Sequence, residues 1–165
     1  AILQLMARAK DIKHLASDLK VIMEDAKREA ASQIHFSLQY RSPWWTGTFN
    51  RSWVISQTPV EPTKEREITG PWNKVKPVRK PPKFQKNIPP TSLSKSLYIG
   101  NEVEYAGFVV GQARWKGKSY YEHAQEKNIT PRPKKYDWFQ IYWKTGRMLK
   151  DVDNGFNKAG FNVVG

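Results

Sequence analysis

The chain has 165 residues and no cysteine, and its 28 Lys and Arg residues against 15 Asp and Glu residues give a formal net charge of +13. The length suits a single domain over residues 1–165, and seven each of Trp, Tyr and Phe are enough for a modest core. Without cysteine, a disulfide framework and a thiolate metal site are excluded. No apolar run is long enough to span a bilayer, so we expect a cytoplasmic product without membrane contact.

An amphipathic pattern occupies the first quarter of the chain. Apolar residues recur three or four positions apart from Ile12 to Leu38, with charged residues between them and no Gly or Pro before Pro43. This spacing predicts a helix over 3–40. Such a helix is about 55 Å long, whereas a compact domain of this size has a radius of gyration of about 15 Å. We therefore expect the helix either to break or to overhang its domain and pack against a neighbouring copy.

Two short strands are expected after this helix. Thr46 is placed to cap a helical turn that puts Phe49 and Trp53 on one face. A strand should follow over 53–58, and a second strand over 97–101 is expected to pair with it. The segment between the two strands then forms the tip of an oversized hairpin.

The segment between these strands carries the strongest charge signal. Residues 68–101 hold seven Lys or Arg, six of the eleven prolines and no acidic residue. Such a run repels itself and cannot form a regular ladder of hydrogen bonds, so we predict an extended basic arm over 68–96 that meets a polyanion through phosphate contacts. The alternative is that the segment is a solvated loop that binds no polyanion and whose charges only keep the protein soluble. The residues expected to face DNA or a partner are Lys74, Lys76, Arg79, Lys80, Lys83 and Lys86.

A second basic loop is predicted over 111–135, after a strand end that turns into a helical turn over 104–110. This loop holds seven Lys or Arg and two Glu. Trp72 and Trp115 lie inside the two basic segments, where base stacking or contact with a neighbouring subunit is expected. The partner-facing residues predicted in the second loop are Arg114, Lys116, Lys118, Arg132, Lys134 and Lys135.

A final helix is predicted over 136–157, with Asp137 near its positive end and Gly146 weakening it slightly. Residues 161–164 are suited to an edge strand. The predicted fold class is α+β, in which the N-terminal and C-terminal helices pack on a small antiparallel sheet that carries the extended Pro/Lys-rich hairpin arm.

The chain offers little for catalysis. Residues 117–119 read Gly-Lys-Ser, as at the end of a phosphate-binding loop, but the earlier glycine would fall at Gln112, and Gly111 is one residue out of register. The three histidines are widely separated and have no metal-ligand spacing. We therefore predict that the protein is not an enzyme and that it uses no cofactor and no metal.

Several short motifs follow one another in a fixed order. They are a Thr-Gly step before a Ser-Trp pair, an Asn before a Tyr-Ala pair, and a Pro-Arg-Pro segment before the last helix: Thr46, Gly47, Ser52, Trp53, Asn101, Tyr105, Ala106 and residues 131–133. In this order the chain resembles, over residues 5–157, the neck and tail-completion proteins of tailed bacteriophages. That family usually has an acidic residue soon after the Tyr-Ala step. Here Val109 and Val110 precede Gly111, so the acidic position is missing.

The resemblance implies a structural virion protein, assembled in the host cytoplasm into a ring between the head-closure proteins and the tail terminator or tail tube. Copies of the arm around one axis would line a DNA channel through non-specific phosphate contacts or clamp an adjacent ring, and the long helix would pack on a neighbour. Two alternatives stay open. One is a stand-alone nucleic-acid-binding protein, which tight, salt-sensitive binding of a monomer to oligonucleotides would favour; the other is a tail-terminator ring protein.

Overall fold

The computed structural model describes residues 12–43, 47–64, 88–126 and 137–161. In chain order its elements are α2 (Ile12–Arg41), α3 (Thr48–Arg51), β1 (Trp53–Ser56), β2 (Tyr98–Asn101), α4 (Ala106–Val109), α5 (Tyr120–Glu126), α6 (Trp138–Lys144) and α7 (Arg147–Lys158). Helices at both ends of the chain and one small antiparallel sheet confirm the predicted α+β class.

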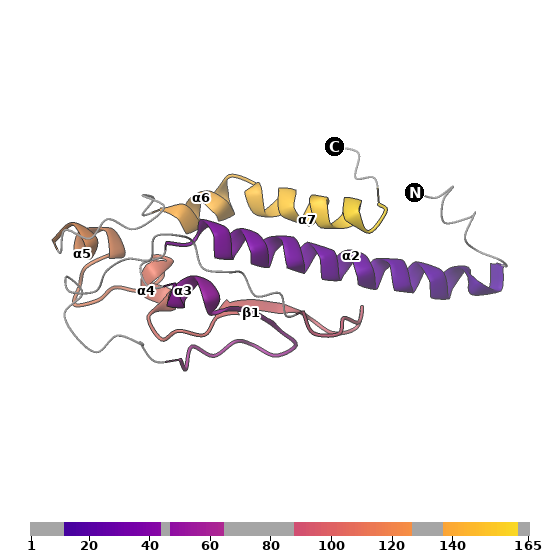
Figure 1. Ribbon diagram of the computed structural model, residues 1–165, viewed down its shortest axis with the longest axis horizontal. Coiled ribbons are helices and arrows are strands. Elements are labelled where there is room, and N and C mark those ends of the chain that lie inside the picture. Colours follow the sequence, from indigo (N-terminus) through magenta and orange to yellow (C-terminus); the bar gives the residue numbers. More distant parts are fainter. Residues whose placement is uncertain (1–11, 44–46, 65–87, 127–136, 162–165) are drawn as a thin grey trace.

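Helix α2 is the element on which the others are arranged. In Figure 1, α7 runs antiparallel along one side of α2, and the sheet with α3 lies on the opposite side. The 30 residues of α2 span about 45 Å. Its N-terminal turns extend beyond both α7 and the sheet (Figure 1), which is the predicted overhang. Residues 3–11 of the predicted helix lie outside the described residues.

Helices α2 and α7 meet through small residues. Ala26 and Ala30 on α2 are buried, as is Gly155 on α7. A Cβ atom added at Gly155 would lie 2.3 Å from both the Cα and the backbone nitrogen of Ala30, so the two backbones are in direct contact. A glycine inside a helix costs about 1 kcal/mol relative to alanine. At this position the close approach of the helices requires it.

The C-terminal region is two helices, so the single helix expected over 136–157 is a wrong prediction. Gly146 adopts a left-handed conformation with φ 74° and separates α6 from α7. A residue without Cβ adopts this conformation at no steric cost, so Gly146 ends the helix instead of only weakening it. The Tyr142 hydroxyl then donates a hydrogen bond to Asp151 Oδ2 at 2.8 Å, joining the two helices.

The predicted pairing of the two strands is confirmed. β1 and β2 are antiparallel, with Trp53 opposite Asn101 and Ser56 opposite Tyr98. β1 ends two residues earlier than predicted because the Ser56 hydroxyl accepts a hydrogen bond from the Thr58 backbone N–H at 3.1 Å, which bends the chain.

After β1 the chain reverses and runs back along β2. Val60 packs over Gly100, where an added Cβ would lie 2.6 Å from the Val60 Cβ. Further on, the Lys64 backbone N–H donates to the Glu102 carbonyl at 2.7 Å, and the Lys64 carbonyl accepts from the Glu104 N–H at 3.2 Å. Residue 64 therefore lies beside the far end of β2, next to α4.

The core is centred on three aromatic rings from three elements. Phe49, Trp53 and Trp138 meet edge to face, with ring centroids 5.8 to 6.3 Å apart. This geometry brings the positive edge of one ring to the negative face of the next. The buried residues packed around them are Leu38, Val103, Ala106, Val109, Val110 and Tyr142. Trp138 is 3% exposed, whereas Trp143 of the same helix is 58% exposed.

Replacing Gly155 with alanine should force α2 and α7 apart. Although alanine favours a helix, its Cβ would overlap the backbone of Ala30, and overpacking typically costs about 1–3 kcal/mol. We expect a loss of about 2 kcal/mol in the free energy of unfolding, measured by denaturant titration. Gly107→Ala is the matched control, because its Cβ would meet its nearest neighbour at an ordinary 3.5 Å. Equal stability of the two variants would contradict the close crossing.

Candidate functional site

Most of the motif residues lie around one buried junction between α3, β1, β2 and α4. Gly47 is the N-cap of α3 and has a left-handed backbone with φ 92°, which favours glycine; Thr46, the expected cap, lies outside the described residues. The Ser52 hydroxyl donates to the Thr48 carbonyl at 2.8 Å, and the Ser52 carbonyl accepts from the Glu102 N–H at 3.0 Å. Ser52 thus ties the end of α3 to the end of β2.

Asn101 is the second link in this junction. Its Nδ2 donates to the Phe49 carbonyl at 2.8 Å, and its Oδ1 accepts from the Val103 N–H at 3.2 Å. The side chain is buried, so both hydrogen bonds are shielded from water. Tyr105 stacks on Phe49 with 6.2 Å between ring centroids, and Ala106 begins α4 as a buried residue. The motif residues in the described part of the chain therefore join chain segments.

A group of buried polar residues that sequence reasoning did not single out completes the junction. Asn50 Nδ2 donates to the carbonyls of Gln39 and Ser42, at 2.9 and 2.8 Å. The Ser42 hydroxyl donates to the Leu38 carbonyl at 2.6 Å and accepts from Trp53 Nε1 at 3.3 Å. The sequence contains a pattern that indicates this polar group: the polar residues at 35, 39 and 42 recur at helical spacing beside the apolar face of the first helix.

His35 belongs to the same group. Its Nε2 lies 2.6 Å from the Trp53 carbonyl, and because a carbonyl only accepts, Nε2 must carry the proton. Burial lowers the pKa of His35, and the hydrogen bond to Trp53 partly opposes this effect. The ring is therefore held neutral. A role in fastening α2 to β1 accounts for this histidine without a metal or a proton-transfer step.

The first half of the second basic loop is a tight hairpin turn. Trp115 and Lys118 exchange backbone hydrogen bonds of 2.9 and 3.0 Å. Between them, Lys116 and Gly117 both have positive φ, 49° and 76°, as a two-residue hairpin of this type requires. Arg114 Nη1 donates to the Gly117 carbonyl at 2.9 Å, across the turn. The side chains of this turn are exposed, including the ring of Trp115 at 58%.

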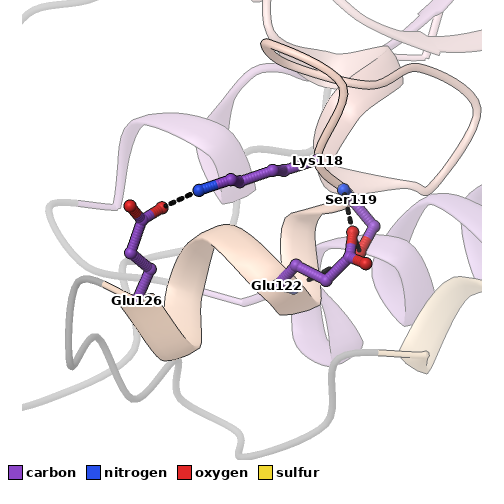
Figure 2. A network of polar contacts seen from close by, with 4 residues as sticks. All are labelled: Lys118, Ser119, Glu122 and Glu126. Carbon is purple, nitrogen blue, oxygen red and sulfur yellow. Dashed lines mark hydrogen bonds and ion pairs between the residues drawn. The ribbon is translucent and has the colours of Figure 1, made fainter.

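The turn is fastened to α5, a helix inside the segment predicted as loop. Figure 2 shows the contacts: Lys118 Nζ pairs with Glu126 at 2.8 Å, and Glu122 Oε2 accepts from the Ser119 backbone N–H at 2.7 Å. The Ser119 hydroxyl in turn accepts from the Glu122 N–H at 3.3 Å, which completes a capping box. The hydrogen bonds from Ser119 lower the pKa of Glu122. This Ser-x-x-Glu pattern was the signal for α5 that sequence reasoning missed.

The same contacts engage the groups of Lys118 and Ser119 that a phosphate would need as donors. The Ser119 backbone N–H is directed at its own carboxylate partner, Glu122, and so is not open to an anion. The resemblance of Gly117-Lys118-Ser119 to a phosphate-binding loop therefore has no structural counterpart. Of the other residues predicted in this loop, Arg132, Lys134 and Lys135 lie outside the described residues.

The six lysines and arginines predicted in the basic arm all fall within 65–87, outside the described residues. The described chain does place the two roots of this segment. One root is Lys64, held beside Glu102 and Glu104 at the far end of β2. The other root lies near the start of β2, where Gln57 Nε2 donates to the Pro90 carbonyl at 2.7 Å. The four residues of β2 lie between these points, which corresponds to about 14 Å.

The second root is also fastened to α2. Lys27 Nζ donates to the Ser92 carbonyl at 2.9 Å and to the Lys95 carbonyl. The Thr91 hydroxyl donates to the Glu24 carbonyl at 3.1 Å. These contacts join positions more than 60 residues apart in the chain. Both ends of the basic segment are therefore held by the folded body.

Among the described residues, no group of three His, Cys, Asp or Glu is arranged to hold a metal ion. In the same part of the chain, none of the helices combines the length and the apolar character needed to cross a membrane.

Replacing Asn101 with alanine should destabilise the junction. The change removes a donor to the Phe49 carbonyl and an acceptor for the Val103 N–H, and each buried group left without a partner costs about 1–3 kcal/mol. We expect a loss of about 3 kcal/mol, measured by chemical denaturation. Glu104→Ala, an exposed change three residues away, should stay within about 0.5 kcal/mol. If the two variants behave alike, Asn101 does not hold the junction.

Acidification should destabilise the protein through His35. An unfolded histidine binds a proton near its ordinary pKa of 6.5, whereas folded His35 resists protonation. The unfolded state therefore binds more protons below pH 6.5, and stability falls with a slope of up to about 1.4 kcal/mol per pH unit. His35→Gln should lose this contribution, and His14→Gln, which alters an exposed residue, should retain it. Melting curves between pH 7.5 and 5 in which all three proteins lose stability equally would exclude the effect.

Comparison of the chain with protein-family models, with curated proteins and with solved structures finds no match.

Proposed function

We propose that this chain is a structural virion protein that assembles into a ring in the neck of a tailed bacteriophage, between the head-closure proteins and the tail terminator or tail tube. In this role it does no chemistry, and the ring forms part of the conduit for the genome. The observation that carries the proposal is a basic segment without acidic residues, 68–101, whose two roots are held on a folded body at Lys64 and on α2.

The charge distribution suits a conduit. Residues 1–67 hold ten basic and eight acidic residues and so are close to balanced, whereas residues 68–101 hold seven basic residues and no acid. Lys and Arg contacts with phosphates are sequence-independent and weaken with salt. DNA that must slide through a channel requires contacts of this kind, because readout of base edges would favour particular registers.

The motif order supports the assignment to the phage family. In the folded chain Gly47 and Ser52 form the two ends of α3, and Asn101 fastens β2 to α3. These are structural positions that a non-enzymatic assembly protein would need. A tail-terminator ring of the same conduit fits these features equally well.

A stand-alone nucleic-acid-binding protein is the second candidate. The observation that favours it is the exposed Trp115, which lies between Arg114 and Lys116 on the surface. An aromatic ring flanked by cations is suited to stacking on an unpaired base. This candidate predicts a monomer that binds short oligonucleotides tightly and in a salt-dependent manner.

Locating the chain in phage particles tests the proposal. We expect a peptide tag on the C-terminus to be detected by electron microscopy at the head–tail junction, in several copies per particle. Native mass spectrometry of the purified chain should show higher-order species when head-closure proteins are added. A chain that is absent from virions and stays monomeric with these partners would exclude the neck assignment.

Reversing the charge of the basic arm should impair DNA delivery. We expect the fourfold variant Lys76→Glu, Arg79→Glu, Lys80→Glu and Lys83→Glu to lower infectivity at least tenfold. The slope of log affinity against log salt for duplex DNA should fall by up to about 3.6. The matched control reverses four exposed charges on the C-terminal helices: Lys144, Arg147, Lys150 and Lys158. Normal assembly and delivery by the arm variant would show that the arm has no electrostatic role.

A further inference from the structure

Two exposed surfaces of the molecule are complementary and lie at opposite ends of it. The first is the Trp115 turn, residues 114–118, which directly precedes α5. The second is the α2 stripe, made of Leu15, Leu19 and Met23. In Figure 1, α5 lies at one end of the molecule and the N-terminal turns of α2 lie at the other. One copy therefore cannot bring its own two surfaces together.

The Trp115 turn presents an exposed apolar side chain among cations, on a backbone of fixed shape. Trp115 is 58% exposed, and the backbone beneath it is fixed by the paired hydrogen bonds with Lys118. The ion pair from Lys118 to Glu126 fastens the turn to α5 (Figure 2). Arg114 is exposed beside the ring, with one guanidinium nitrogen bound to Gly117. A turn whose backbone is already ordered loses little backbone conformational entropy when it binds.

The α2 stripe is a continuation of an existing helix interface. Leu15, Leu19 and Met23 are four residues apart, so they share one face of α2, and each is 36 to 39% exposed. The same face continues into Ala26 and Ala30, which are buried where α7 crosses. Because α2 extends beyond α7 (Figure 1), no helix of the described part of the chain covers the last part of this face.

An acidic edge runs along this stripe. Asp18, Asp25 and Glu29 are spaced by seven and four residues, which places three carboxylates on one side of the apolar positions. Asp25 pairs with Arg28 at 2.9 Å, but both side chains are 48% exposed, and such a surface pair contributes little stability. An incoming cation can therefore compete for this edge.

We infer that the Trp115 turn of one copy docks on the α2 stripe of a second copy, with its cations beside the acidic edge. The contact joins two different surfaces, so each copy keeps one turn and one stripe for further neighbours. Repetition of such a contact produces a closed ring or an open chain. The inference rests on the proposed ring and names the surfaces that would build it.

The charge near the turn favours a protein partner over nucleic acid. Residues 111–126 contain three Lys or Arg and two Glu, a net charge of only +1, which is weak for a phosphate-binding surface. Trp and Arg, in contrast, are the residue types that most often anchor protein interfaces. For a chain with a net charge of +13, self-association also requires a local acidic surface, and the edge of the α2 stripe supplies one.

Because the chain has no cysteine, disulfide trapping tests this contact directly. Purified full-length Lys116→Cys and Asp18→Cys are mixed under mild oxidation, and the covalent dimer is followed by non-reducing gel electrophoresis. We expect the mixture to form dimer at least ten times faster than either variant alone. The control mixture pairs Asp18→Cys with Lys150→Cys, a position on the exposed side of α7. Equal rates in the two mixtures would overturn the inference.

A complementation experiment distinguishes this contact from others. Trp115→Ala removes the exposed ring of the turn, and Leu19→Lys puts a charge into the half-exposed stripe, so neither change empties the core. Each variant alone should associate at least tenfold more weakly than the wild type in sedimentation velocity, with unchanged circular dichroism. A 1:1 mixture should stop at dimers, because one intact turn and one intact stripe remain. Wild-type-like association of Trp115→Ala, or a wild type that stays monomeric with no trapped dimer, overturns the contact.

The same variants test the alternative that the Trp115 turn binds nucleic acid instead of a second copy of the chain. If Trp115→Ala loses binding to a short single-stranded oligonucleotide and the mixture forms no dimer, the turn serves nucleic acid and the inference is wrong. Location of the tagged chain at the head–tail junction would still support the neck assignment in that case. The two proposals can therefore fail separately.

Discussion

The hydrogen bonds between the last turns of α2 and the α3–β1 segment are the interaction on which the rest of the structure depends. Asn50 satisfies carbonyls at the end of α2, and His35 fastens the helix to β1. These groups are buried, so breaking one bond leaves a partner without water to replace it. Directional bonds of this kind fix one arrangement of the aromatic core around Phe49, Trp53 and Trp138. These hydrogen bonds therefore fix the position of the C-terminal turns of α2 against α3 and β1. They do not involve the N-terminal turns of α2.

The elements that the sequence predicted well are those governed by a regular pattern. The long helix and the antiparallel pairing of β1 with β2 follow from apolar spacing, which acts over many residues. The errors fall where one residue decides the backbone. Gly146 takes a left-handed conformation and divides the C-terminal helix, and Ser119 with Glu122 begins a helix inside a charged segment. Composition alone does not show which glycine will adopt positive φ or which serine will cap a helix.

The candidate surfaces likewise have some features that the sequence predicts and others that only the folded structure shows. The basic character of both loops is a property of composition and could be predicted. The fixed shape of the Trp115 turn depends on positive φ at Lys116 and Gly117 and on the ion pair between Lys118 and Glu126. The contacts of Lys27 with residues 92 and 95 bridge distant parts of the chain, and no local pattern reports such a contact. The junction polar residues stood at helical spacing beside Leu38, but their partners became evident only from the fold.

The described chain on either side of the basic segment is attached to the folded body. Before the segment, residue 64 is paired with residues 102 and 104 beyond β2, and after it residues 90–92 are bonded to Gln57 and to α2. An insert that is anchored in this way differs from a terminal tail, because the residues before and after it both keep fixed positions on the body.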